Sequence, residues 1–181
     1  MKKTIVGAIV GGILLFLVQF VNWSVINLHR VAQQHTNNQD SILQYLDSHL
    51  QRSGAYALPT YPDNASSTEK ESMLKAQEGK PWALINFHKA YHVNLVSNLV
   101  RNLLVDIVAV WLFAWIVVAT GKQGFGKIFI ASLFLGFIIF LNIPYTLHIW
   151  YLTPGLKADL IDALAGWGIT GIWLGWWLSK K

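Results

Sequence analysis

The chain has 181 residues, of which 54% are apolar and only 13% are charged, about half the charged share of an ordinary soluble domain. The apolar residues are gathered in long blocks, which indicates a membrane protein rather than a soluble one. The absence of cysteine excludes a disulfide framework, thiolate metal sites and a catalytic thiol.

The net charge of +5 does not indicate a nucleic-acid-binding face. Six lysines lie at the ends of apolar blocks with no acid among them, and the other eight basic residues are matched by nine acids elsewhere. We therefore expect the lipid bilayer as a partner and no nucleic acid. The six anchoring lysines are Lys2, Lys3, Lys122, Lys127, Lys180 and Lys181.

The first predicted transmembrane helix covers residues 1–22. Its apolar block has Gln19 as the single polar interior residue, and its length is near the lower limit for a spanning helix. A cleaved signal peptide would have a shorter apolar region ending in a small-residue cleavage site, which is missing here. The block is therefore interpreted as a retained anchor.

Residues 23–97 are predicted to form an extracytoplasmic loop domain. Asp40 is expected to cap an amphipathic helix, and Ser66 with Glu69 matches a capping box at the start of a second helix. Residues 55–58 and 82–87 read as short strands that could pair as a ribbon. This segment has little core of its own, so we expect it to pack as a cap on the outer end of the bundle.

Three further transmembrane helices are predicted at residues 98–120, 128–150 and 159–178, separated by a basic turn at 121–127 and a turn at 153–155. The predicted fold class is an all-α membrane protein. It consists of a four-transmembrane-helix bundle with a small cap of mixed helices and short strands.

The orientation follows from the lysines, because cytoplasmic loops carry the excess of basic residues near helix ends. Both termini and the 121–127 turn are then cytoplasmic, and the protein is a multi-pass protein of a cell inner membrane. Only short tails and one turn remain in the cytoplasm, so a function must reside in the bundle or in the loop domain. No Walker or dinucleotide-binding glycine pattern is present.

A group of polar residues interrupts the outer halves of the predicted spans, where charges are costly and usually face protein or water. Two interpretations stay open. Arg101 could form a buried ion pair with Asp106 or Asp162 that locks the helices together, or the group could line an outward-facing pocket, with a proton or ion relay through Asp106. The group comprises Asn98, Arg101, Asn102, Asp106, Asn142 and Asp162.

Four histidines are expected near the outer membrane face, and histidines four apart on a helix can bind zinc or copper. Interfacial histidines also serve as simple anchors, so no cofactor is expected and metal or haem binding is the alternative. These histidines are His29, His88, His92 and His148.

Small residues four apart let helices approach closely in lipid. Gly7 and Gly11 have this spacing in the first span, and Gly171 and Gly175 have it in the fourth. We expect these pairs to pack the first span against the fourth, or alternatively to form a homodimer seam.

Several short motifs resemble those of a family of small four-span bacterial inner-membrane proteins. They are Trp23 and His29 after the first span, Tyr56-Ala57-Leu58-Pro59 in the loop, Asn142-Ile143-Pro144, and Asp162 with Gly166-Trp167. The resemblance implies the four-span layout and carries over no catalytic residue.

The leading functional hypothesis is a non-enzymatic envelope protein that binds a protein partner or senses a condition. The alternatives are a small transporter or a lipid- or quinone-binding protein with an outward-facing pocket around Arg101, Asp106 and Asp162, and a metal or haem protein.

Overall fold

The computed structural model describes residues 2–180, and about 71% of the structure is helical. The chain divides into two compact units. The bundle unit combines the residues up to Gln34 with those from Asn94 onward, and the loop unit is His35–Val93. The helical content and a small two-stranded sheet agree with the predicted fold class at this level.

The bundle unit is built from long helices that are apolar on most of their surface. In chain order the elements are α1 (Lys2–Phe20), the π-helical η1 (Val21–Val25), the 3-10 helix η2 (Leu28–Ala32), α4 (Leu95–Ala119), α5 (Phe125–Phe140), the π-helical η3 (Leu141–Tyr145), α6 (Thr146–Tyr151) and α7 (Leu156–Ser179). Pro144 lies inside η3, where its ring cannot continue the regular hydrogen-bond ladder. The predicted third span is therefore one helical stretch with an irregular section.

Three helical stretches are long and apolar enough to cross a membrane, namely Lys2–Val25, Leu95–Ala119 and Phe125–Tyr151. The helix α7 is not among them, although its 24 residues would be long enough. Its sequence holds two aspartates near the start, four glycines and four tryptophans, and the last two types add little to hydropathy. The fourth span thus stays a prediction.

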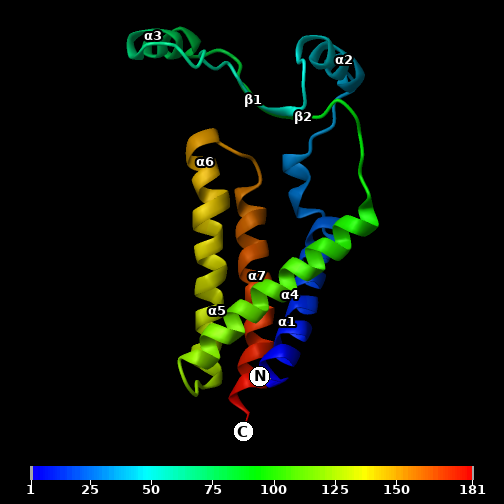
Figure 1. Ribbon diagram of the computed structural model, residues 1–181, viewed down its shortest axis with the longest axis vertical. Helices are drawn as coiled ribbons and strands as arrows, with labels where there is room; N and C mark the ends of the chain where they lie inside the picture. The colour runs from blue at the N-terminus through cyan, green and yellow to red at the C-terminus, as the bar shows by residue number, and fades with distance from the viewer. Residues whose placement is uncertain (1, 181) are drawn as a thin grey trace. The chain divides into compact units, whose positions relative to one another are not determined.

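Helix α7 occupies the centre of the bundle unit. It packs against α5 on one side and α1 on another, while α4 packs on α1 (Figure 1). A methyl group on Gly12 would lie 2.5 Å from the Cα atom of Ile107, and one on Gly136 would lie 2.6 Å from the carbonyl oxygen of Ala163. Glycine at these two positions therefore sets the close α1–α4 and α5–α7 approaches.

The four glycines predicted to pack the first span against the fourth are all buried, but they do not all face the expected helix. Gly7 faces Trp177 of α7, and Gly11 meets Val110 of α4 more closely than Trp173 of α7. Gly171 and Gly175 face Ser132 and Phe125 of α5. The prediction is therefore wrong for the α7 pair. The direction in which a glycine faces depends on which helices become neighbours, and spacing along the chain does not reveal this.

Tryptophans of α7 hold α1 through hydrogen bonds to its backbone. The indole Nε1 of Trp173 donates to the carbonyl oxygen of Gly7 at 2.9 Å, and Nε1 of Trp177 donates to that of Lys3 at 2.7 Å. Ser132 donates across the other interface to the carbonyl oxygen of Trp167 at 2.9 Å. These bonds satisfy polar groups that would be costly to leave unpaired in an apolar interior.

The loop unit contains α2 (Gln39–His49), β1 (Gly54–Leu58), α3 (Ser67–Gln77) and β2 (Ala83–Phe87). The strands pair antiparallel, with Tyr56 opposite Ile85, which confirms the predicted ribbon. The capping box of Ser66 and Glu69 is also confirmed. The predicted cap of α2 is wrong, because Asn38 takes the N-cap position and Asp40 lies in the first turn.

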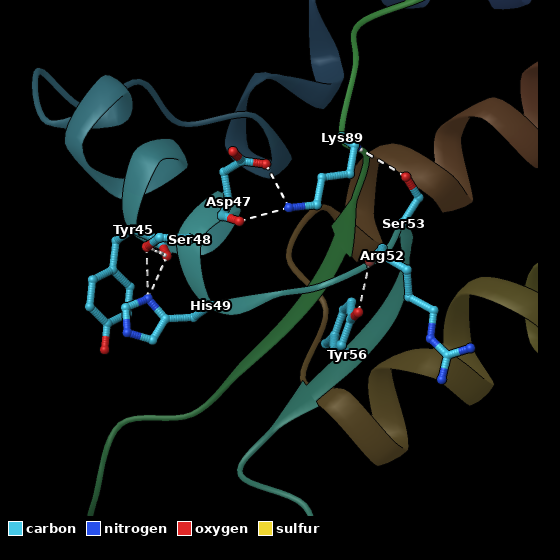
Figure 2. A network of polar contacts seen from close by, with 8 residues as sticks. All are labelled: Tyr45, Asp47, Ser48, His49, Arg52, Ser53, Tyr56 and Lys89. Carbon is cyan, nitrogen blue, oxygen red and sulfur yellow. Dashed lines mark hydrogen bonds and ion pairs between the residues drawn. The ribbon is translucent and has the colours of Figure 1, made fainter.

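Polar contacts, more than a hydrophobic core, hold the loop unit together. Among its described residues only Phe87 is buried. The Lys89 ammonium donates to the backbone and side-chain oxygens of Asp47 at 2.7 and 2.8 Å, and the backbone N–H of Lys89 donates to Ser53 (Figure 2). One lysine thus ties the end of α2 to the chain segments beside both strands.

Candidate functional site

A buried histidine meets two carboxylates in the bundle unit. His29 is 5% exposed, and its Nε2 lies 2.6 Å from Oδ2 of Asp162. Its Nδ1 lies 3.7 Å from Oδ1 of Asp159, which is one helical turn before Asp162 on α7. Asn22 Nδ2 donates to the other oxygen of Asp162 at 2.5 Å. These four residues are called the histidine–acid cluster below.

The backbone after α1 places His29 in this cluster. Asn27 adopts a left-handed conformation with φ 56°, which asparagine tolerates better than most residues, and η2 begins directly after it. The ring of Trp23 then stacks on the imidazole with centroids 4.0 Å apart and an interplanar angle of 7°. The Trp23 indole therefore covers one face of the His29 imidazole, and the two aspartate carboxylates contact its edge.

A second polar cluster joins α1 to α4. Asn102 Nδ2 donates to Gln19 Oε1 at 3.0 Å, and Gln19 Nε2 donates to Oδ1 of Asp106 at 3.3 Å. Asp106 is only 5% exposed, and its Oδ2 has no hydrogen-bond partner among the described residues. The amide cluster of Gln19, Asn102 and Asp106 therefore contains a buried acceptor that lacks a donor, an arrangement that is rare in folded proteins.

A pocket of about 410 Å³ opens beside the amide cluster, where α1 ends and α4 begins. This volume is within the range of small-molecule sites. The pocket combines aromatic rings with amide and hydroxyl groups, which suits a ligand with an apolar body and a polar head. Its lining consists of Phe16, Gln19, Phe20, Trp23, Ser24, Asn98, Leu99 and Asn102.

The polar residues predicted to act as one group are divided by the structure. Asn98 and Asn102 line the pocket, and Asp106 lies behind Gln19. Arg101 is exposed and forms no ion pair with either predicted aspartate within residues 2–180. The predicted arginine ion pair is therefore not formed.

The two remaining members of that predicted group lie elsewhere. Asp162 belongs to the histidine–acid cluster. Asn142 is exposed and donates to the carbonyl oxygen of Ile138 in its own helix at 2.9 Å.

The four candidate metal-binding histidines have separate surroundings. His29 contacts the two aspartates, and His148 Nδ1 lies 2.9 Å from the carbonyl oxygen of Thr153. His88 and His92 line a groove in the loop unit. No group of three or more histidine, aspartate or glutamate side chains is placed to hold a metal ion in the described part of the chain. The geometry therefore gives no support to the predicted metal alternative.

Sequence reasoning did not select Gln19, Asn22 or Asp159 as site residues. Gln19 carried a signal, because it is the single polar residue within the first apolar block. Asp159 lies three residues before Asp162, a spacing that places both on one helix face. Asn22 had no local signal that distinguished it from an interfacial anchor.

Comparisons of the chain with protein-family models, with curated proteins and with solved structures find no match.

Proposed function

We propose that the protein crosses a bacterial inner membrane four times with both chain ends in the cytoplasm, as in the family that the sequence motifs resemble. The three apolar stretches support this, and so does α7, which packs between α1 and α5 and would share their surroundings. The lysine clusters support the orientation. A reporter fused after Lys181 should be located in the cytoplasm, and a reporter inserted after Thr60 should be located outside it.

Within this layout, we propose that the function is binding of an amphipathic molecule of the lipid or quinone class in the pocket between α1 and α4. The observation that carries the proposal is the buried Oδ2 of Asp106, which lacks a donor among the described residues and lies behind Gln19, a residue of a pocket lined with aromatic rings and amides. A purely structural polar contact would be expected to satisfy both oxygens. The open acceptor and the neighbouring cavity are instead what a ligand-binding site requires.

The aromatic and the amide residues of the pocket have different roles in recognition. The rings of Phe16, Phe20 and Trp23 offer apolar surface to a tail or a stacked ring. Asn98 and Asn102 offer amide donors and acceptors for a carbonyl or hydroxyl head group. Gln19 is hydrogen-bonded to both Asn102 and Asp106, so a ligand that displaces its amide gains access to the buried carboxylate.

The test uses a benzoquinone with a decyl tail as the probe and the full chain in a neutral detergent, with binding followed by quenching of tryptophan fluorescence. Asn102→Ala should weaken binding about five- to tenfold, the value of one lost hydrogen bond of about 1 kcal/mol. Asn142→Ala removes the same side chain outside the pocket and should bind like the unmodified protein. If the unmodified protein, Asn102→Ala and Asn142→Ala bound the probe equally, the proposed binding site would be refuted.

Asp106→Asn separates binding from folding. The amide keeps an acceptor for Gln19 and replaces the unpartnered acceptor Oδ2 with a donor, so the variant should fold while losing the probe. Loss of folding together with binding would instead indicate a structural role for Asp106.

A second candidate function is binding of a protein partner by the loop unit, the leading hypothesis from sequence. A groove of about 780 Å³ on this unit favours it, with Leu43, Phe87 and Tyr91 among its lining residues. A photo-crosslinking amino acid at Tyr91 should give a discrete adduct in intact cells, while the same label at Tyr61, outside the groove, should not. Identical adducts at both positions would contradict the proposal that the groove binds the partner.

A further inference from the structure

A second pocket lies at the other end of α1. It has a volume of about 300 Å³ and lies where α1 and α5 begin and where α4 and α7 end. Lys3, Lys122 and Gln123 contribute its polar surface, and Val117, Ile128 and Leu178 contribute apolar surface. The pocket therefore lies at the level where the apolar helices meet the aqueous phase.

Within residues 2–180, the positive charge of this pocket has no acidic partner. None of its lining residues is acidic, and the bundle helices contain no acid between Asp106 and Asp159 or after Asp162. The Lys3 ammonium donates to the carbonyl oxygen of Lys180, which is a neutral acceptor. The Lys180 ammonium itself lies 3.2 Å from the centroid of the Trp176 ring. The side chains of Lys3 and Lys122 thus share one cavity that no acidic side chain of residues 2–180 lines.

We propose that this pocket binds the phosphate of an anionic membrane phospholipid. The two lysines supply charge complementarity for the phosphate, and Gln123 supplies an amide donor. Val118 also lines the pocket and is half exposed, so the apolar lining reaches the bundle surface, where the acyl chains of a lipid would lie. Basic pockets between membrane helices on the cytoplasmic side are known to take lipid head groups.

The position of the pocket favours a lipid over a free anion. Inorganic phosphate would use the lysines but would gain nothing from Val117, Ile128 or Leu178, which make up the apolar wall. A phosphodiester that is already held in the bilayer uses both parts of the pocket. The inference relies on the membrane placement proposed above but not on the α1–α4 pocket, which lies at the opposite end of α1.

The test measures lipid retention by native mass spectrometry of the full chain, released from neutral detergent with added phosphatidylglycerol or phosphatidylcholine. Phosphatidylglycerol should be retained in preference. Lys122→Gln should lower its retention about fivefold, equivalent to about 1 kcal/mol for one lysine beside an anionic head group. Lys127→Gln removes the same charge from the start of α5 outside the pocket and should leave retention unchanged.

Three results would overturn the proposal. Equal losses in Lys122→Gln and Lys127→Gln would indicate diffuse attraction, and equal retention of the two lipids would indicate no charge selection. Displacement of phosphatidylglycerol by millimolar inorganic phosphate would indicate a site for the free anion. Lys122→Arg keeps the charge and should keep retention, which separates loss of binding from any folding defect in Lys122→Gln. None of these measurements uses the quinone probe, so failure of either proposed site is seen independently.

Discussion

Nε2 of His29 lies 2.6 Å from Oδ2 of Asp162, so the short helix after the first apolar stretch is fastened directly to α7. The imidazole is buried, and Asn22 donates to the second oxygen of the same carboxylate. The contact joins residues that are 133 positions apart in the chain. It is therefore a tertiary link that holds η1 and η2 against the bundle.

His29→Ala should destabilise the protein by about 2 kcal/mol, because hydrogen bonds to charged groups are worth about 1.5–3 kcal/mol. Thermal unfolding of the full chain in a neutral detergent measures the effect. His35→Ala is the matched control, since His35 is exposed and its ring contacts only Asn37 among the described polar groups. Equal unfolding temperatures for the two variants would contradict the structural importance of the His29 contact.

A double-mutant cycle distinguishes the pair from separate effects of its members. His29→Ala and Asp162→Ala should be non-additive by about 1 kcal/mol or more, as expected for side chains in direct contact. An additive result would show that the two side chains do not stabilise each other.

Gly171→Ala should be among the most damaging single-methyl changes in α7. The added Cβ atom would overlap Oγ of Ser132 and lie 2.8 Å from its Cβ, so rotation of the hydroxyl would not suffice and α5 and α7 would have to separate. Overpacking of this kind costs about 1–3 kcal/mol. Gly168→Ala in the same helix meets only Leu133 Cδ2, at 3.5 Å, and should be nearly neutral. Unfolding temperatures of the two variants provide the comparison.

The clash at Gly171 can also be relieved on the other helix. Combining Gly171→Ala with Ser132→Gly removes the contacting atoms and should restore part of the loss. Failure of this rescue would show that the α5–α7 contact is not the cause.

The elements predicted from the sequence are those that depend on neighbouring residues. The capping box at Ser66 needs only Glu69, three residues away, and the apolar blocks can be identified from their length. The β-ribbon likewise follows from two short strands. Helix α7 is harder to interpret, because its glycines and tryptophans pack well inside protein while adding little to hydropathy.

The polar contacts between helices were less predictable. Asn102 and Asp106 are four residues apart, share a face of α4, and both meet Gln19. Arg101 is five residues from Asp106, which rotates it by about 140° around the helix and removes it from that face. The contact between His29 and Asp162 depends on a left-handed turn at Asn27, which no periodicity indicates.

Trp177→Phe should weaken the attachment of α1 to α7. The phenyl ring keeps most of the apolar contact with Gly7 but removes the hydrogen bond to the carbonyl oxygen of Lys3, at a cost of about 1 kcal/mol. Trp176→Phe is the control, because Trp176 is exposed. If both variants unfolded at the same temperature as the unmodified protein, the indole hydrogen bond would have no measurable value.

Glu69 should titrate below the usual range of a glutamate. Hydrogen bonds from the hydroxyl and then from the backbone N–H of Ser66 lower the pKa of the Glu69 carboxyl, because both donors favour its ionised form. The capping box contributes fully above the pKa that Glu69 has in the unfolded chain, and its contribution is lost as pH falls through the lower pKa of the folded state.

Carbon-13 NMR of the Glu69 carboxyl as a function of pH measures this shift in the full chain. Ser66→Ala removes the hydroxyl donor and should move the pKa of Glu69 upward toward its usual value. Ser72→Ala also deletes a hydroxyl in α3, but that hydroxyl donates to the backbone oxygen of Glu69 and not to its carboxyl, so the titration should not change. An unchanged pKa in Ser66→Ala would show that the side-chain half of the capping box does not form in solution.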